Sequence, residues 1–181
     1  MPVERRLFKE IRAVPQTEFS QFSRVYIAPA TVTFDKRWLK QYKHDASQRC
    51  KSKIQEQYVR VFKEQLEKAF SKDAQLEIVR EASAVTSDVL IVKPAVYDLY
   101  INGPDFSIAV NQYVRYAGRA SASIELRSFD QQILALITDK RDTIMRAVTK
   151  PEKTSRVLNL RDFRFLMQRW SNRLIEYVSG E

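Results

Sequence analysis

The sequence predicts an α+β fold: a single mixed, mostly antiparallel sheet with two amphipathic helices packed on one of its faces. Two long stretches, residues 47–70 and 160–178, repeat apolar residues at three- and four-residue steps, which is typical of helices with one buried face. Shorter stretches between and around them are rich in β-branched and aromatic residues, as strands are. A chain of 181 residues suffices for one core. We therefore expect an N-terminal extension at residues 1–22 and one domain at 23–181.

The elements are expected in the order β-α-β-β-β-β-α. Residues 1–22 have weak periodicity and a breaker at Pro15, so they read as an extension or a short helix on the body. A strand at 24–34 contains Pro29, which indicates an edge strand or a bulge. The helix at 47–70 and a short strand at 76–79 follow, and they complete a β-α-β unit with a right-handed crossover.

Residues 87–105, SDVLIVKPAVYDLYINGPD, read as a strand that continues on both sides of a proline. Strict alternation would turn Lys93 to the apolar side, and one extra residue there would remove that conflict. We therefore predict a bulge or bend at Pro94. Asn102-Gly103-Pro104-Asp105 is a turn signal, and the strands at 106–127 and 133–142 should complete an antiparallel meander.

The last helix, at 160–178, is predicted to begin after Asn159 as its N-cap. Its apolar stripe should meet the first helix and the alanine-rich strand in one core. The residues expected to form this core are Trp170, Leu174, Phe163, Ile54, Phe62, Leu66, Ala122, Ile124 and Leu126.

The net charge of +9 would suit an anionic partner such as nucleic acid. Basic residues are dense only in residues 36–53, where aromatic side chains lie among them. An alternative function is therefore a cytoplasmic basic domain that binds nucleic acid through a surface made of Lys36, Arg37, Trp38, Lys40 and Lys43. The competing interpretation is a solvated helix face whose two aromatics, Trp38 and Tyr42, turn into the core.

Four segments together resemble a bacterial domain-of-unknown-function family, number 3313, which consists of small envelope lipoproteins. They are VYIAPATVTF, SDVLIVKPAVYDLYINGPD, AGRASASIELRSFDQQILALITDKRD and RDFRFLMQRWSNRLIEYV, and they span most of residues 24–178. The family's hairpin usually has a glycine at the turn near Asp130, which is absent here. The lipid-bearing cysteine is absent too. The resemblance implies a domain on the periplasmic side of the outer membrane whose signal and lipid anchor have been removed.

The available chemistry is sparse. Glycine occurs only at 103, 118 and 180, so no glycine-rich phosphate loop can be written, and no cofactor is expected. His44 is the one histidine and is expected on the surface, Cys50 is the one cysteine, and no metal site is predicted. A carboxylate-dependent hydrolase would have to use the aspartates in or beside strands, although we expect solvated charge at these positions: Asp98, Asp130, Asp139 and Asp142.

A set of aromatic residues surrounds the 102–105 turn and forms the candidate interaction surface: Tyr97, Tyr100, Phe106, Tyr113 and Tyr116. Two helices are too few to cover a strand pair that long, so these rings should be exposed and should serve association with another protein or a second copy. Alternatively, the N-terminal extension folds over them. The sequence thus predicts a non-enzymatic envelope domain that acts by protein binding or as a scaffold.

Overall fold

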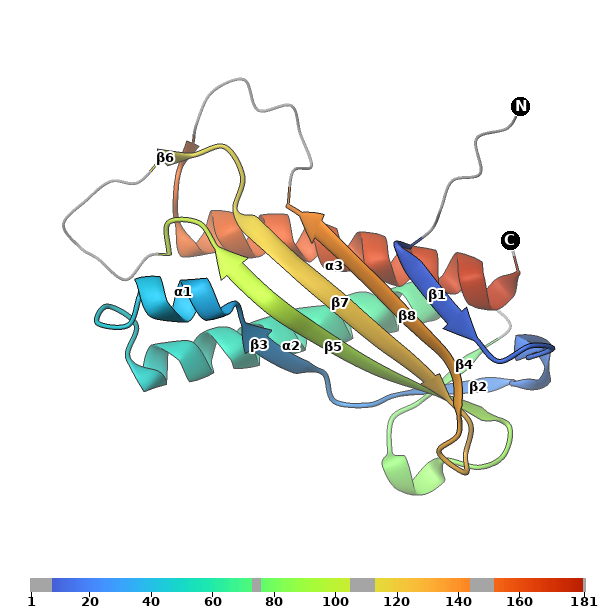
Figure 1. The fold of residues 1–181 in the computed structure, drawn as a ribbon. Coiled ribbons are helices and arrows are strands. Elements are labelled where there is room, and N and C mark those ends of the chain that lie inside the picture. Colours follow the sequence, from blue (N-terminus) through green and yellow to red (C-terminus); the bar gives the residue numbers. More distant parts are fainter. Residues whose placement is uncertain (1–7, 73–75, 105–112, 144–151, 181) are drawn as a thin grey trace, which may run out of the picture.

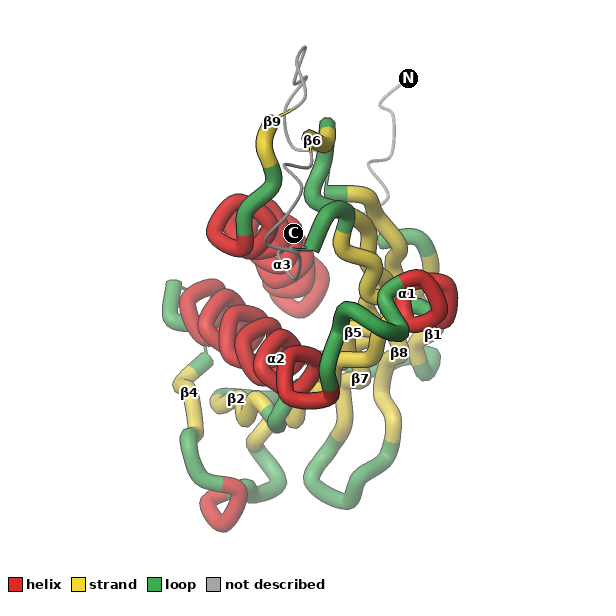
Figure 2. Tube along the Cα trace, turned by 90° about the vertical axis from the view of Figure 1, so that its left-hand side faces the viewer, coloured by secondary structure: helices red, strands yellow, loops and turns green. Residues whose placement is uncertain are grey.

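A computed structural model describes residues 8–72, 76–104, 113–143 and 152–180. In these residues the chain forms one seven-stranded mixed sheet with two long helices, α2 and α3, on one face, which confirms the predicted fold class (Figures 1 and 2). The strands follow the order β1-β8-β7-β5-β2-β4, and β3 pairs with β5 beyond the end of β2.

The elements have these bounds. The main sheet consists of β1 (Glu10–Ala13), β2 (Arg24–Ile27), β3 (Thr31–Phe34), β4 (Glu77–Val79), β5 (Val89–Ile101), β7 (Gly118–Arg127) and β8 (Ile133–Asp142). A separate two-stranded ladder joins β6 (Tyr113–Val114) to β9 (Glu152–Lys153). The helices are α1 (Lys36–Gln41), α2 (Gln48–Phe70) and α3 (Arg156–Ser179), with short 3-10 turns at Phe19–Gln21 and Ala82–Ala84.

The sheet is parallel on one side of β5 and antiparallel on the other. β2 runs parallel to β4, as the predicted β-α-β unit requires. β2 and β3 also run parallel to β5, whereas β5, β7 and β8 form the predicted antiparallel meander. The strand expected at 24–34 is interrupted at Pro29, which lies between β2 and β3. Pro94 of β5 lies opposite this interruption, after the last residue paired with β2 and before the first paired with β3. A residue without an amide proton is tolerated there.

The predicted position of the bulge, at Pro94, is wrong. β5 stays in register with β7 from Ile91 through Tyr97. The register shifts between Tyr97 and Tyr100, and Asp98 takes a positive φ of 52°. Lys93 points to the face of the sheet without helices and pairs across the strands with Glu125. The extra residue lies at Asp98, because a short polar side chain adopts the left-handed conformation more readily than a β-branched one.

Serine side chains cap both long helices. The Ser47 Oγ accepts from the amide of Cys50 at 3.2 Å, and the Ser155 Oγ accepts from that of Leu158 at 3.1 Å. The N-cap predicted at Asn159 is therefore wrong: α3 begins a turn earlier, and Asn159 lies inside the helix, buried. A serine before the apolar stripe satisfies the first amide groups as well as an asparagine does.

The predicted core is confirmed. Trp170, Phe62 and Leu66 are fully buried between the helices and the sheet, and Ile54 packs against their cluster. Asp139, expected as solvated charge, is instead 3% exposed and accepts a hydrogen bond from the Trp170 indole nitrogen at 2.9 Å. The alternation of β8 turns this position toward the helices, and the indole N–H satisfies the carboxylate there.

The segment expected as an extension or short helix contributes a strand to the sheet. β1 pairs antiparallel with β8 at the edge of the sheet, and the buried rings of Phe8 and Phe22 belong to the core cluster. The ring of Phe19 meets Tyr177 of α3 with centroids 5.5 Å apart. Residues 8–22 therefore lie along β8 and α3.

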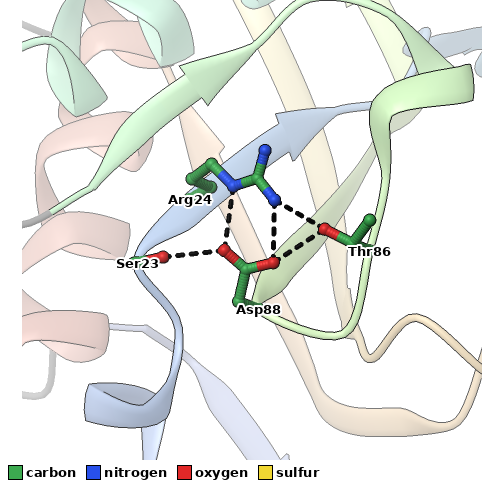
Figure 3. A network of polar contacts seen from close by, with 4 residues as sticks. All are labelled: Ser23, Arg24, Thr86 and Asp88. Atoms are coloured by element: carbon green, nitrogen blue, oxygen red, sulfur yellow. Dashed lines mark hydrogen bonds and ion pairs between the residues drawn. The ribbon is translucent and has the colours of Figure 1, made fainter.

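A polar network holds the start of β2 against the start of β5 (Figure 3). The Asp88 carboxylate accepts from the Arg24 guanidinium at 2.8 and 2.9 Å, from the Thr86 hydroxyl at 2.7 Å and from the Ser23 hydroxyl at 2.8 Å. The Arg24 hydrogen bond is the main reason that the pKa of Asp88 lies far below its ordinary value. This network fixes the parallel register of β2 and β5.

Candidate functional site

The two surfaces predicted separately from the sequence meet at one end of the molecule, where β5 ends beside α1 (Figure 1). The Trp38 indole nitrogen donates to the carbonyl of Ile101 at 3.1 Å, and the amide of Asp35 donates to the carbonyl of Leu99 at 3.0 Å. α1 is thereby tied to the last residues of the strand that carries Tyr97 and Tyr100. The aromatic and basic segments are therefore parts of one surface.

Two side chains hold Tyr100. Its hydroxyl donates to Gln41 Oε1 at the end of α1, and the Arg119 guanidinium lies over its ring, 4.7 Å from the centroid. Arg119 also reaches the Asp35 carboxylate at 3.4 Å. Burial alone would raise the pKa of Asp35, but the amide of Arg37 and the Arg119 guanidinium outweigh it and hold this pKa below its ordinary value. The half-buried ring is thus fixed in one position.

The other tyrosines differ in exposure. Tyr97 is half-buried on the sheet face without helices, opposite the buried Ser121. Tyr113, in β6, is 62% exposed, and Tyr116, just before β7, is 38% exposed. The Asn102 side-chain amide donates to the carbonyl of Tyr116 at 3.2 Å, which fastens Tyr116 to the end of β5. We call the set Tyr97, Tyr100, Tyr113 and Tyr116 the tyrosine end.

Phe106, the remaining member of the predicted aromatic set, lies outside the described residues. The N-terminal segment does not pair with the strands that carry the tyrosines: over residues 8–22 it lies along β8 and α3. The exposed rings of Tyr113 and Tyr116 are therefore not covered by residues 8–22.

One of the residues predicted to form the basic surface is buried. Lys36, Arg37, Lys40 and Lys43 are exposed, but Trp38 is 0% exposed and stacks on Phe34, with ring centroids 4.4 Å apart. Including Trp38 in a base-stacking surface is therefore wrong, and the interpretation that turns this aromatic into the core is confirmed. The hydrogen bond from the Trp38 indole nitrogen to the carbonyl of Ile101 holds Trp38 on the inner side of α1. The cations of α1 thus border the tyrosine end without an aromatic of their own.

Three residues of this site were missed by sequence reasoning: Asp35, Gln41 and Arg119. Gln41 and Arg119 contact Tyr100, and Asp35 pairs with Arg119. Asp35 also caps α1, accepting from the amide of Arg37 at 2.7 Å, and the sequence Asp35-Lys36-Arg37-Trp38 carried that signal. Arg119 lies opposite Tyr100 only because the strand register shifts at Asp98, which alternation did not reveal.

Two further residues that the sequence offers for chemistry are exposed. His44 is exposed, as predicted, and Asp130 lies in the exposed turn between β7 and β8. Within the described ranges, no three His, Cys, Asp or Glu side chains gather so that they could hold a metal ion. None of the described helices is long and apolar enough to cross a membrane.

No protein-family model matches the chain, and no curated protein matches it. Among solved structures, it is similar to the PelC dodecamer from Paraburkholderia phytofirmans, with 12% identity over 91% of this chain and 97% of that chain, at a TM-score of 0.44. A variant of that dodecamer gives 10% identity over 91% and 98%, at 0.44. A neuraminyllactose-binding hemagglutinin homolog from Helicobacter pylori gives 10% over 94% and 91%, at 0.34. Similarity this distant assigns neither function nor partner to this chain.

Proposed function

We propose that this chain is a non-enzymatic binding domain of the bacterial cell envelope and that the tyrosine end is its working surface. The observation that carries the proposal is the pair of exposed rings, Tyr113 and Tyr116, in the segment that leads into β7, together with Tyr100, which Gln41 and Arg119 hold in place. A surface of fixed rings loses little conformational freedom when a partner binds.

Tyrosine suits a surface that is alternately free and covered. Its ring supplies apolar contact area, and its hydroxyl bonds to water when the partner is absent. Aromatic residues are enriched at the centres of protein interfaces for this reason. The proposed partner is another protein, and a second copy of this chain is the first to test. A pair of copies would be two-fold symmetric, because a closed contact hides both surfaces whereas a head-to-tail contact propagates.

The location in the envelope is supported by the resemblance to lipoprotein family 3313, through the four segments quoted above. We propose a lipoprotein domain on the periplasmic side of the outer membrane, attached through a lipid on a cysteine upstream of Met1. Metabolic labelling of the natural gene product with a fatty acid tests this location. A product that takes up no lipid and remains in the cytoplasmic fraction would contradict it.

Nucleic-acid binding remains the alternative because Lys36, Arg37, Lys40 and Lys43 border the tyrosine end, all exposed. Counterion release makes such binding weaken steeply with salt. Two copies of a chain with a net charge of +9 instead repel each other at low salt, so added salt should favour their association through tyrosines. Salt dependence therefore separates the two functions.

Hydroxyl-radical footprinting tests where the contact lies. As the concentration of the chain is raised, oxidation of Tyr113 and Tyr116 should fall because a second copy covers their rings. Phe129, which is 54% exposed in the distant β7–β8 turn, serves as the internal control and should react equally at every concentration. Protection of Phe129 rather than of the tyrosines would place the contact elsewhere.

A further inference from the structure

A pocket lies between the first halves of α2 and α3, against the end of β5. It holds about 560 Å³ of empty space, part of which is open to solvent. Its apolar walls come from Ile54 and Tyr58 of α2, and from Ile101 and Pro104 at the end of β5.

Two buried polar side chains line this pocket without a hydrogen-bond partner among the described residues. Tyr58 is 3% exposed and Asn159 is 5% exposed. No fully buried side-chain nitrogen or oxygen in the described ranges lacks a partner, so the hydroxyl and the amide keep some contact with solvent. Burial raises the pKa of Tyr58, so its hydroxyl stays protonated and is available as a donor. A ligand in the pocket can replace water as the hydrogen-bond partner of these two groups.

The mouth of the pocket is cationic. Lys53 and Arg156 line it and are exposed, and no carboxylate is among the described side chains that line it. The Arg156 guanidinium donates to Gln57 Oε1 from Nε at 3.2 Å and from Nη2 at 3.1 Å, which holds this cation at the rim. An apolar cavity with two cations at its opening matches a ligand that is apolar along its body and negative at one end.

We propose that this pocket binds a small molecule with an apolar body and a single anionic end group, such as a long-chain carboxylate. The body lies against Ile54, Ile101 and the ring of Tyr58, and the carboxylate accepts hydrogen bonds from Arg156 and Asn159. The pocket shares no side chain with the tyrosine end, so it is a second site, independent of the proposed function.

Cys50 provides a built-in reporter because it is the one cysteine of the chain and lines the pocket, half-buried. The rate at which a thiol reagent labels Cys50 should fall when dodecanoate is added and should fall far less with dodecanol, which lacks the charge. Labelling that dodecanoate does not slow at any concentration below its micelle formation, or that dodecanol slows equally, would overturn the proposal.

Variants locate the ligand. Arg156→Gln should weaken dodecanoate protection about tenfold or more, since a charge-assisted hydrogen bond is lost. Ile54→Trp should abolish protection by filling the apolar part of the pocket. Arg164→Gln removes an exposed cation of α3 outside this pocket and is the matched control. Dodecanoate should protect Cys50 in this variant as it does in the parent. Equal loss of protection in Arg156→Gln and Arg164→Gln would show that bulk charge, and not the pocket, attracts dodecanoate.

Failure of this proposal is distinguishable from failure of the proposed function. A Tyr113→Ser/Tyr116→Ser variant alters the tyrosine end and leaves the described lining of the pocket unchanged. Dodecanoate should therefore protect Cys50 in this variant as in the parent. Loss of protection there would contradict an independent second site.

Discussion

Asp139 is a buried carboxylate that three donors satisfy. The Trp170 indole nitrogen donates at 2.9 Å, the Arg141 Nε at 2.5 Å and the amide of Lys9 at 3.2 Å. A buried charge is tolerated only with such partners. The contact joins α3 to β8 and to the segment before β1, so one residue fastens three parts of the fold.

Removal of the Trp170 side chain should therefore be strongly destabilising. Trp170→Ala leaves a cavity and takes one donor from Asp139, so the free energy of unfolding should fall by roughly 3–5 kcal/mol. Phe165→Ala on the same helix is the control, because Phe165 is 37% exposed, and it should lower this free energy by less than about 1 kcal/mol. Urea denaturation measures both, and equal losses would show that α3 does not dock through Trp170.

The Asp88 network makes a pH-dependent contribution. The pKa of Asp88 is lowered in the folded state, chiefly by the Arg24 hydrogen bond. The contribution of Asp88 to the free energy of unfolding is therefore fully present above the unfolded pKa of about 3.9 and is lost as pH falls below that value. Asp88→Asn should therefore be less stable than the parent at neutral pH, and the difference should shrink in acid. Urea denaturation across the acidic range measures this, and a difference that grows in acid would contradict the sign.

At the scale of elements, strand and helix positions were predictable, and so was the inner face of β7, but the faces of β5 were not. Residues 47–70 and 160–178 form α2 and most of α3, because their apolar stripes repeat with the helical period. In β5, Val89, Leu90, Ile91 and Val92 are all buried, so apolar character did not reveal which side meets the helices. Alternation did not reveal the register shift between Tyr97 and Tyr100 either.

The bulge can be tested at Asp98 itself. Its φ of 52° suits glycine and opposes β-branched side chains. Asp98→Gly should change the free energy of unfolding by less than about 1 kcal/mol, whereas Asp98→Val should lower it by about 1–3 kcal/mol. Chemical denaturation of the pair measures the difference. A valine variant as stable as the glycine variant would show that position 98 is not strained.

The backbones of β5 and β7 approach each other closely at the same end of the sheet. Gly118 has a φ of 148°, and a Cβ added to it would lie 1.9 Å from the carbonyl oxygen of Tyr100. Only glycine fits there, next to Tyr100 at the end of β5 and Arg119 at the start of β7. The sequence shows this glycine but not why glycine is required at position 118, because the close approach depends on the register of two strands.

At the scale of the whole molecule, the sequence predicted the layers but not how its functional segments assemble. The order of strands and helices followed from local periodicity, and the core followed from the apolar stripes. The meeting of α1 with the end of β5 did not, because the bonds from Trp38 to Ile101 and from Tyr100 to Gln41 join residues about sixty positions apart. The pocket between α2 and α3 was missed likewise, since its lining comes from three elements.

Sedimentation velocity tests most directly whether the tyrosine end is the binding surface. The parent, Tyr113→Ser/Tyr116→Ser and the control Phe129→Ser are compared over a range of concentrations at low and high salt. We expect the parent and Phe129→Ser to associate reversibly, more strongly at high salt, and the double variant to remain a monomer with unchanged circular dichroism. Association that persists undiminished in the double variant would contradict the account.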